Sequence, residues 1–499
     1  MHMPTGLSTT LTATSDFLFG TILVWFLLGA GIYFTIRTRV LPLRHVKDII
    51  RAIIGSRSDA RGGISSFQAF AIGLACRVGT GNIIGVALAL ILGGPGAIFW
   101  MWIVALLGTS TAFMEATLAQ IFKVRQADHT FRGGPAYYIS RGLNLKVPAA
   151  IFAVVFLIAN ALSMPMVQAN AISATIGGAT GAAPWLSAVI VVALTAPVLL
   201  GGLRAIARVT EYLAPIMAIA YLLIVLFIVL THPAGAWNAL VSIFAGAFGL
   251  RAGLSGVAGG LTAAVLNGVR RGLFSNEAGL GGAANAAGSA TVDHPVQQGF
   301  IQAFGVIVDT IFICTATALA ILIASPEVYT PGVTIPDAAG TLTQDAVADL
   351  LGSWTRLPMM LMIVIFAYST ILGAYSYAEV NMDYLTRHPV ATKALAMGAV
   401  VCTAIGSLTQ LITVWTIADI LLGVGAIINI AALIMLTPWA LGALRDWEKA
   451  QRRQDRDEVL TVAECGSLPG ACLTIRPDAV RFSPNSPSLP ARVPGNAWE

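Results

Sequence analysis

The chain has 499 residues, of which 57% are hydrophobic and 11% are charged, and its formal net charge is +5. Soluble domains carry about 25% charged residues, so this composition excludes a soluble protein and indicates a membrane protein with many spans. The modest charge gives no indication of nucleic-acid binding. The five cysteines have neither metal-site spacing nor the pattern of a disulfide framework.

Apolar segments of about 20 residues, long enough to cross roughly 30 Å of hydrocarbon, recur along the chain. We predict eleven spans at 17–36, 66–92, 96–122, 148–178, 184–202, 210–230, 242–270, 297–324, 357–382, 392–412 and 415–440. Lys and Arg cluster after spans one, three, five, seven and nine and in the C-terminal tail. Because cytoplasmic loops are rich in Lys and Arg, we expect the N-terminus outside and the C-terminus in the cytoplasm.

The predicted fold is an all-α polytopic membrane protein with three parts. Residues 1–65 form an extra N-terminal helix and a basic cytoplasmic loop. The core, 66–440, divides into five spans in 66–230 and five in 242–440. Because five is odd, the halves must insert in opposite senses, as inverted repeats do. Residues 441–499 form a cytoplasmic tail that we expect to be partly disordered.

The second span has a polar, glycine-containing centre, RVGTGN at 77–82. Each Gly costs roughly 1 kcal/mol relative to Ala within a helix. A broken helix is tolerated in a membrane only where it is buried in protein or lines a wet cavity, and there its peptide groups can hold a ligand. A Gly-rich packing face is the alternative, but it explains neither Arg77 nor Asn82. We therefore predict a binding site at this position.

The inverted-repeat argument requires a second broken helix at the start of the second half. The stretch LSGVAGG in span seven predicts this break, with Gly256 and Gly259 beside the substrate. The motif SNEAGLGG, which begins at Ser275, is an alternative position. We disfavour it because it would draw Arg270 and Arg271 into the membrane interior.

Four motifs resemble the sodium:alanine symporter family, whose members are also called alanine or glycine:cation symporters. They are RVGTGN at 77–82, GGPGAIFWMW at 93–102, FRGGPAYYI at 131–139 and SNEAGLGGAANAA at 275–287. The resemblance extends over most of the predicted core. It implies a LeuT-type fold, import of a small neutral amino acid such as alanine or glycine together with Na⁺, and a bacterial or archaeal plasma membrane (the inner membrane of a Gram-negative cell).

A zwitterionic amino acid needs partners at both ends. The amides of Gly79, Thr80 and Gly81, at the positive end of the following half-helix, are placed to bind its carboxylate. Na⁺ is a hard cation and takes oxygen ligands. Carbonyls of Ala75 and Val78, just before the break, are candidates.

Further site residues follow from the resemblance. It implies that the hydroxyl pair Ser369 and Thr370 in span nine completes the sodium site, although helix packing also explains such a pair. It implies substrate contact at Gln168. Asn82 is a candidate ligand for either the ion or the substrate.

Span nine departs from the family pattern. Relatives usually have tryptophan after the glycine of GAYSYAE, where this chain has Ala374. Either Tyr375 fills the lost volume or the pocket is wider. The second alternative predicts tolerance of serine or glutamine.

Arg77 is a charge at membrane depth, which is costly and usually functional. It either balances the substrate carboxylate, or substitutes for a second cation, or pairs with a carboxylate as a gate or strut. Glu115 and Asp309 are the candidate carboxylates.

Other classes of function fit the sequence less well. An intramembrane enzyme is disfavoured because the six histidines fall in loops or at span ends and no HExxH or GxSxG motif occurs. A proton-coupled permease of the same fold, with Asp309 or Glu115 carrying the proton, is the alternative to Na⁺ coupling. The sequence leaves the oligomeric state open.

Overall fold

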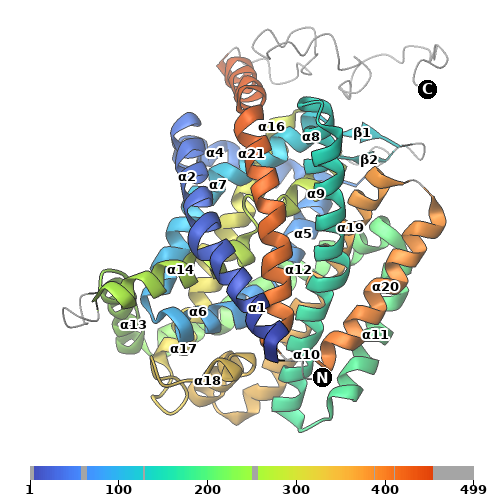
Figure 1. Cartoon of the computed structure of the whole chain (residues 1–499). Coiled ribbons are helices and arrows are strands. Elements are labelled where there is room, and N and C mark those ends of the chain that lie inside the picture. Colours follow the sequence, from blue (N-terminus) through green and yellow to red (C-terminus); the bar gives the residue numbers. More distant parts are fainter. Residues whose placement is uncertain are drawn as a thin grey trace, which may run out of the picture.

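The computed structural model describes residues 5–57, 64–126, 130–249, 257–386, 388–409 and 411–452 (Figure 1). The α-helices are α1 (Thr5–Phe17), α2 (Val24–Arg37), α3 (Leu41–Arg44), α4 (Val46–Ile54), α5 (Ser66–Arg77), α6 (Val86–Gly93), α7 (Gly96–Ile121), α8 (Pro135–Gly142), α9 (Lys146–Ile158), α10 (Met164–Thr180), α11 (Pro184–Leu200), α12 (Gly202–Thr231), α13 (Pro233–Ala247), α14 (Val257–Asn276), α15 (Gly282–Ser289), α16 (Pro295–Val306), α17 (Thr315–Ile323), α18 (Leu342–Leu351), α19 (Arg356–Leu385), α20 (Pro389–Ser407) and α21 (Leu411–Arg452).

Wider or tighter turns connect some of these helices. The π-helical turns are η1 (Leu18–Leu23), η3 (Gly81–Gly85), η4 (Ala159–Ser163) and η5 (Ile307–Cys314), and the 3₁₀ turns are η2 (Gly55–Arg57), η6 (Pro336–Gly340) and η7 (Ser353–Thr355). Two short strands, β1 (Val124–Arg125) and β2 (Phe131–Arg132), pair antiparallel.

Eight of the described helical segments are long and apolar enough to cross a membrane, and the bent pair α5 with η3–α6 makes nine. Apolar α11 is shorter, at 17 residues. The predicted span 242–270 is wrong, because α13 ends at Ala247 and a separate helix, α14, begins at Val257. The other predicted spans fall on helices of the structure.

The ends of the helices gather into two opposite faces (Figure 1). One face carries α4, α8, the β1–β2 pair and the end of α21, and the basic segments 37–57, 123–126 and 130–146 lie there. The opposite face carries α18 and the beginning of α1. Arg270 and Arg271, predicted to lie with the basic loops, instead lie inside α14, while Arg61 and Arg387 lie outside the described residues.

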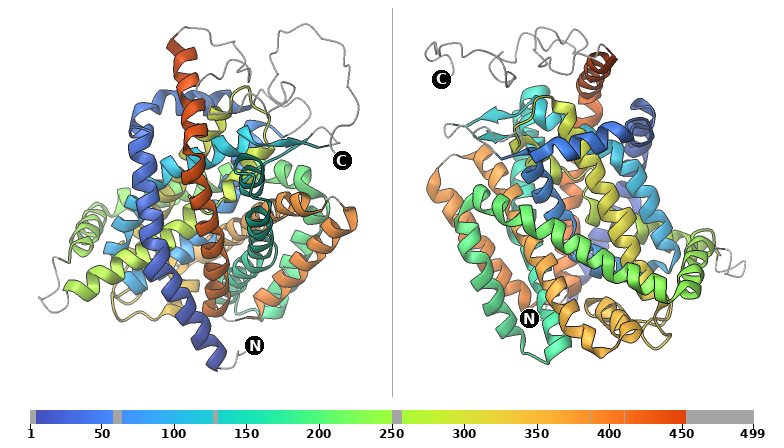
Figure 2. Two further views of the ribbon diagram at one scale, coloured as in Figure 1. Left: turned by 45° about the horizontal axis from the view of Figure 1, so that its top comes forward. Right: turned by 180° about the vertical axis from the view of Figure 1, so that it is seen from behind.

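The core helices pack closely at glycines, as small residues permit within membranes. Helix α7 packs against α14 and α16, and α10 packs against α19 and α20. A Cβ added at Gly373 of α19 would lie 2.8 Å from Cys76 Cβ of α5. Seen from behind, α12 runs obliquely across this core (Figure 2). Helix α5 thus packs on α19, while α14 packs on α6, the continuation of α5 beyond the bend.

The structure shows a helix break at SNEAGLGG. Helix α14 ends at Asn276, and Glu277, Gly279 and Gly281 then adopt positive φ angles of 56°, 91° and 92° before α15 begins. Glycine reaches such angles without steric cost. Gly259 lies inside α14, whereas Gly256 lies outside the described residues. Gly259 is therefore not at a helix break, whereas the prediction for Gly256 falls outside the described residues and stays a prediction.

The two arginines before this break are neutralised by distant acids. Arg271 and Asp419 of α21 form a 3.0 Å ion pair in which both side chains are at most 5% exposed. Arg270 forms a 2.9 Å ion pair with Asp16 of α1. The sequence-based prediction assumed that two arginines at this position would be unpaired charges in the membrane. The SNEAGLGG position was disfavoured for that reason.

Candidate functional site at two helix breaks

The first break has the form of a sharp bend with unwound backbone. Helix α5 ends at Arg77, and η3–α6 continues at 45° to it. Val78 leaves the helical region with φ −79° and ψ 82°. The Gly79 amide turns back to the carbonyl of Arg77 at 3.0 Å, so it does not reach the Ala75 carbonyl as a continued α-helix would require. The predicted binding site at residues 77–82 therefore coincides with an interruption of the helix.

The Ala75 carbonyl is instead bound by α19. Thr370 Oγ1 donates a 2.8 Å hydrogen bond to it, and a Cβ added at Gly79 would lie 2.0 Å from the same Oγ1. Only glycine therefore allows the hydroxyl this close. The Ser369 hydroxyl donates to the Phe366 carbonyl at 2.9 Å, a carbonyl to which Thr370 also donates at 3.1 Å. Of the four predicted ion ligands, Ala75 and Thr370 are in contact, Val78 is at the bend, and Ser369 donates to a different carbonyl.

The peptide amides at the bend are occupied by side chains, as buried amides must be. Gly79 N donates to Asn82 Oδ1 at 3.0 Å, and Thr80 N donates to Gln168 Oε1 of α10 at 3.3 Å. These amides were predicted to be bare. Gln168 lies at the break, where its Oε1 accepts from the Thr80 amide, and the substrate contact that the resemblance implies for it stays a prediction.

Two polar atoms at this position lack partners among the described residues. They are Thr80 Oγ1 and Gln168 Nε2, and both residues are at most 1% exposed. Leaving a buried polar group unpaired costs roughly 1–3 kcal/mol. A hydroxyl and an amide N–H are thus available to a small polar ligand. The surrounding protein shields both side chains from solvent.

The two breaks lie against each other. A Cβ added at Gly81 would meet Phe274 and Ser275 of α14 at 3.3 Å. Phe274 in turn stacks on Trp415 of α21, with ring centroids 4.4 Å apart. Arg271 lies 4.8 Å above the Trp415 ring. This aromatic and cationic stack covers the first break on the side of α14.

Arg77 is buried and braces α16. Its Nη1 donates to the Gln302 carbonyl at 3.1 Å and to Gln302 Oε1 at 3.3 Å, and Gly305 leaves room for the guanidinium. Among the described residues no carboxylate lies within 4 Å of it. Direct ion pairs with Glu115 or Asp309, which were among the alternatives for Arg77, are therefore absent from this part of the chain.

Asp309 receives three neutral donors from both breaks. Asn82 Nδ2 donates to Oδ1 at 2.6 Å, while the hydroxyls of Ser275 and Thr310 donate to Oδ2 at 2.8 and 2.7 Å. The carboxylate is fully buried. Asn82 therefore joins the first break to η5 and is not a free ligand in this structure.

The second break is held by two further carboxylates. Asn429 of α21 donates to Glu115 Oε1 at 2.5 Å and to the Gly279 carbonyl at 2.9 Å. Glu277 accepts hydrogen bonds from Cys76 Sγ at 3.2 Å and from Tyr377 Oη at 3.3 Å. Glu277 thus ties the second break to α5 and α19.

Ala374 is fully buried on α19. The neighbouring Tyr375 directs its hydroxyl to the Thr392 carbonyl of α20 at 3.3 Å. The Tyr375 ring therefore lies at the α19–α20 interface.

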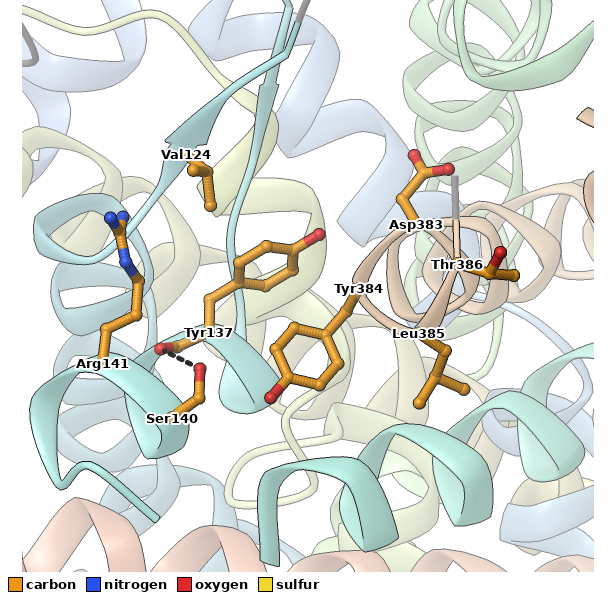
Figure 3. A pocket seen from close by; sticks show the side chains of 8 residues that line it. All are labelled: Val124, Tyr137, Ser140, Arg141, Asp383, Tyr384, Leu385 and Thr386. Atoms are coloured by element: carbon orange, nitrogen blue, oxygen red, sulfur yellow. Dashed lines mark hydrogen bonds between the residues drawn. The ribbon is translucent and has the colours of Figure 1, made fainter. Parts of the chain in front are cut away.

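A cavity of about 390 Å³ lies away from the breaks, on the face that carries the β1–β2 pair (Figure 3). It is lined by Val124, Tyr137, Ser140, Arg141, Asp383, Tyr384, Leu385 and Thr386. Beside it, Arg132 of β2 binds Asp383 at 2.6 Å and approaches Glu379 at 4.0 Å. These pairs fasten the first half of the chain to the end of α19.

Sequence reasoning missed several residues of this region, namely Gln302, Ser275, Glu277, Tyr377 and Asn429. For Ser275 and Glu277 the signal was present, because SNEAGLGG combines polar residues with the glycines of a break. Gln302 and Asn429 are recognisable in the sequence as single polar residues inside long apolar segments. Their partners follow only from the tertiary structure.

Comparisons with known proteins give a family, two relatives and a solved structure of similar fold. The model of the "Sodium:alanine symporter family" matches residues 5–461. The chain is 38% identical over 446 residues to "Probable sodium/glutamine symporter GlnT" of Bacillus subtilis, covering 89% of this chain and 91% of the relative. It is 39% identical over 454 residues to "Putative sodium/proton-dependent alanine carrier protein YrbD" of the same organism, covering 89% and 92%.

The fold is similar to the crystal structure of MhsT in complex with L-phenylalanine. The TM-score is 0.57 at 13% sequence identity, with 76% of this chain and 90% of MhsT covered. This likeness shows a LeuT-type fold. The two relatives are named as a symporter and a carrier, not as enzymes. With a family model that matches nearly its whole length, the chain belongs to the sodium:alanine symporter family, whose members are membrane transporters that couple amino-acid transport to cations.

Proposed function

We propose that this protein imports a small neutral amino acid, such as alanine or glycine, coupled to Na⁺ by alternating access. The observation that carries the proposal is the contact between Thr370 and the Ala75 carbonyl at a helix break. An oxygen pair at an unwound backbone suits a hard monovalent cation. The unpaired Thr80 hydroxyl and Gln168 amide beside it suit the polar ends of an amino acid.

The proposed topology has eleven spans, in which one extra helix precedes a 5+5 inverted repeat. The count is reached when α11 and the broken pair α14–α15 are added to the nine segments described above. The basic loops lie on the face where α21 ends, which supports a cytoplasmic C-terminus and an outside N-terminus. The bacterial or archaeal plasma membrane is the proposed location.

Alternating access requires closure on both sides of the site. On the basic face, Arg132 with Asp383 is the proposed closure. On the opposite side, the stack of Arg271, Trp415 and Phe274 covers the break. If the contacts of one closure separate while those of the other stay formed, the site is exposed to one side of the membrane at a time.

Ion coupling supplies the energy of accumulation. One Na⁺ entering down 100 mV releases about 2.3 kcal/mol, and a tenfold gradient adds about 1.4 kcal/mol. With one ion for each neutral substrate, the limit is on the order of several hundredfold accumulation. The sodium/glutamine relative and the small residue Ala374 support a substrate range that includes serine and glutamine.

The test is uptake of labelled alanine, glycine, serine and glutamine into proteoliposomes, with and without Na⁺ at fixed pH. We expect saturable, concentrative uptake that requires Na⁺, and none in protein-free liposomes. Uptake that never exceeds equilibrium would exclude a transporter driven by an ion gradient.

A proton-coupled permease is the second candidate. The printed name of the YrbD relative includes protons, and the buried carboxylates Asp309 and Glu115 have no basic side chain within 4 Å in the described part of the chain. Uptake driven by a pH gradient in the complete absence of Na⁺ would favour this candidate.

A further inference from the structure

Helix α4 presents an apolar surface that the described part of the chain leaves uncovered. Its residue Ile49 is buried on the side where α4 packs on α16. Val46, Ile50 and Ile54 follow one another at intervals of about one turn and are exposed by 47%, 50% and 77%. Leu43 of the preceding α3 is exposed by 78%. The three exposed residues of α4 form a continuous apolar surface, which we call the α4 stripe.

Two cations lie beside the α4 stripe. Lys47 and Arg51 are also one turn apart, each follows a stripe residue in the sequence, and both are exposed. Among the residues that the structure describes, Lys47 has no carboxylate within 4 Å. Arg51 lies 3.6 Å from Asp48, and an exposed pair at this distance binds weakly. The Asp48 carboxylate also contacts His45 Nδ1 at 2.8 Å. Helix α4 therefore has an apolar flank and a basic flank side by side.

A sharp turn places α4 across the end of the membrane-spanning helices. The segment Thr10–Arg44, which is long and apolar enough to cross a membrane, ends just before α4. Arg39 and Val40 adopt φ angles of 55° and 54°, which are unfavourable for residues other than glycine and most of all for a β-branched residue. Seen from behind, the blue helix α4 runs across α16 and not along it (Figure 2). This orientation is the one that a helix at a membrane surface requires.

Contacts to two other helices hold α4 in this orientation. Glu448 near the end of α21 forms an ion pair with Arg44 and lies 3.2 Å from His45 Nε2. The His45 ring lies 5.3 Å from the ring of Phe300 in α16. Arg44 is therefore committed to the protein, whereas Lys47 and Arg51 face outward.

We propose that α4 lies on the membrane surface and binds anionic phospholipids, with the α4 stripe in the outer acyl region and Lys47 and Arg51 at the phosphates. Lipid is the fitting occupant because the span that precedes α4 already exposes apolar side chains, Ile32 by 48% and Ile36 by 68%. A basic flank beside an apolar one is typical of helices that lie in the interface of anionic membranes. Binding of this kind depends on neither the substrate nor the coupling ion proposed above.

A second copy of the chain is a less suitable occupant. In a symmetric dimer the same surface patch faces itself. Two α4 stripes in contact would bring Lys47 and Arg51 of one copy close to those of the other, and like charges placed together at an interface oppose association. The phosphates of anionic lipids, by contrast, neutralise both cations.

The test is photo-crosslinking of the purified full chain in phosphatidylcholine nanodiscs. The nanodiscs contain a trace of a photoactivatable phospholipid whose headgroup is either phosphatidylglycerol or phosphatidylcholine. Peptides released by pepsin, which does not cut specifically at Lys or Arg, are quantified by mass spectrometry and normalised to residues 216–230 of α12. Since each cation near the surface favours anionic lipid by about fivefold, we expect the phosphatidylglycerol probe to label residues 43–54 at least about fivefold more than the other probe. High KCl should reduce this preference because salt screens the charges.

Variants separate the two flanks of α4. Lys47→Gln combined with Arg51→Gln should lower labelling by the phosphatidylglycerol probe to the level of the phosphatidylcholine probe. Ile50→Asp combined with Ile54→Asp should lower labelling by both probes. Lys449→Gln is the matched control, because it removes an exposed lysine at the end of α21 that projects beyond α4 (Figure 1), and it should change neither. All the replaced side chains are exposed, and the thermal unfolding temperature of each variant checks its folding.

Three results would overturn the lipid site. Equal labelling of the wild type by the two probes would show that α4 does not select anionic lipid. Absence of labelling at residues 43–54 with both probes would place α4 away from the bilayer. Crosslinks between two copies through these residues would assign the α4 stripe to self-association. If the expected labelling is found but uptake does not depend on Na⁺, the lipid site stands and the proposed function fails.

Discussion

The sharpest prediction concerns the hydroxyl of Thr370. Replacing it by Thr370→Val keeps the shape of the side chain and removes the atom that binds Ala75 at 2.8 Å and Phe366 at 3.1 Å. The Ala75 carbonyl has lost its usual helical donor at the break, since Gly79 N turns to Arg77. The variant therefore deprives both the backbone and the proposed ion of one ligand.

The size of the effect follows from the burial of this contact, since Thr370 is 1% exposed. Loss of one buried polar partner costs roughly 1–3 kcal/mol, and each 1.4 kcal/mol is a factor of ten in affinity. We expect the Na⁺ concentration for half-maximal alanine uptake to rise by roughly 5- to 150-fold. At saturating Na⁺, the apparent affinity for alanine should remain close to the wild-type value.

The assay is initial-rate uptake into proteoliposomes over a range of Na⁺ concentrations at constant ionic strength. Thr370→Ser, which keeps the oxygen, is the matched control and should stay within about threefold of wild type. Gly79→Ala, whose added carbon would collide with Oγ1, should lose uptake altogether. An unchanged Na⁺ dependence in Thr370→Val would refute the assignment of this hydroxyl to the ion.

Three further predictions concern selectivity, closure and pH. Ala374→Trp should narrow the proposed wider pocket, so that glutamine and serine no longer compete for alanine uptake while glycine still does; an unchanged competition profile would exclude a wider pocket. Arg132→Ala should release Asp383 and raise the rate at which a membrane-permeant maleimide labels Cys76, read by peptide mass spectrometry, by at least fivefold; equal rates would argue against this closure. Burial lowers the pKa of His294 from 6.5 to about 3, so the unfolded chain binds this proton more tightly and stability falls as pH drops below 6.5. Between pH 7 and pH 5 the loss is about 2 kcal/mol, and His294→Asn, which keeps a helix-capping side chain, should show a smaller decrease in thermal unfolding temperature over that range.

The first break and its neighbours could be predicted from the sequence because the information is local. Glycines and polar residues inside an apolar segment mark RVGTGN directly. The approach of Thr370 to Ala75 followed from the family resemblance. That the amides of Gly79 and Thr80 would be occupied could not be predicted, since their acceptors on Asn82 and Gln168 depend on side-chain orientation and on the packing of α10.

The second break was misplaced for a physical reason. The argument treated Arg270 and Arg271 as isolated charges, for which burial is prohibitive. Their partners, Asp16 and Asp419, lie in the first and last helices of the chain, and nothing in the local sequence indicates these contacts. Glu277 at positive φ is a second non-local feature, because its strained backbone is held by contacts to α5 and α19.

The pairing of Arg271 with Asp419 also has a consequence for biosynthesis. Each arginine at the centre of a membrane helix opposes insertion by about 2.5–3.5 kcal/mol, and the acid that neutralises Arg271 is made 148 residues later. In the proposed topology, in which α14 enters the membrane, this helix would have little tendency to remain in the lipid by itself as the ribosome releases it. Its stable integration would then require α21, so we expect the two-break centre to assemble only when synthesis of the membrane domain is almost finished.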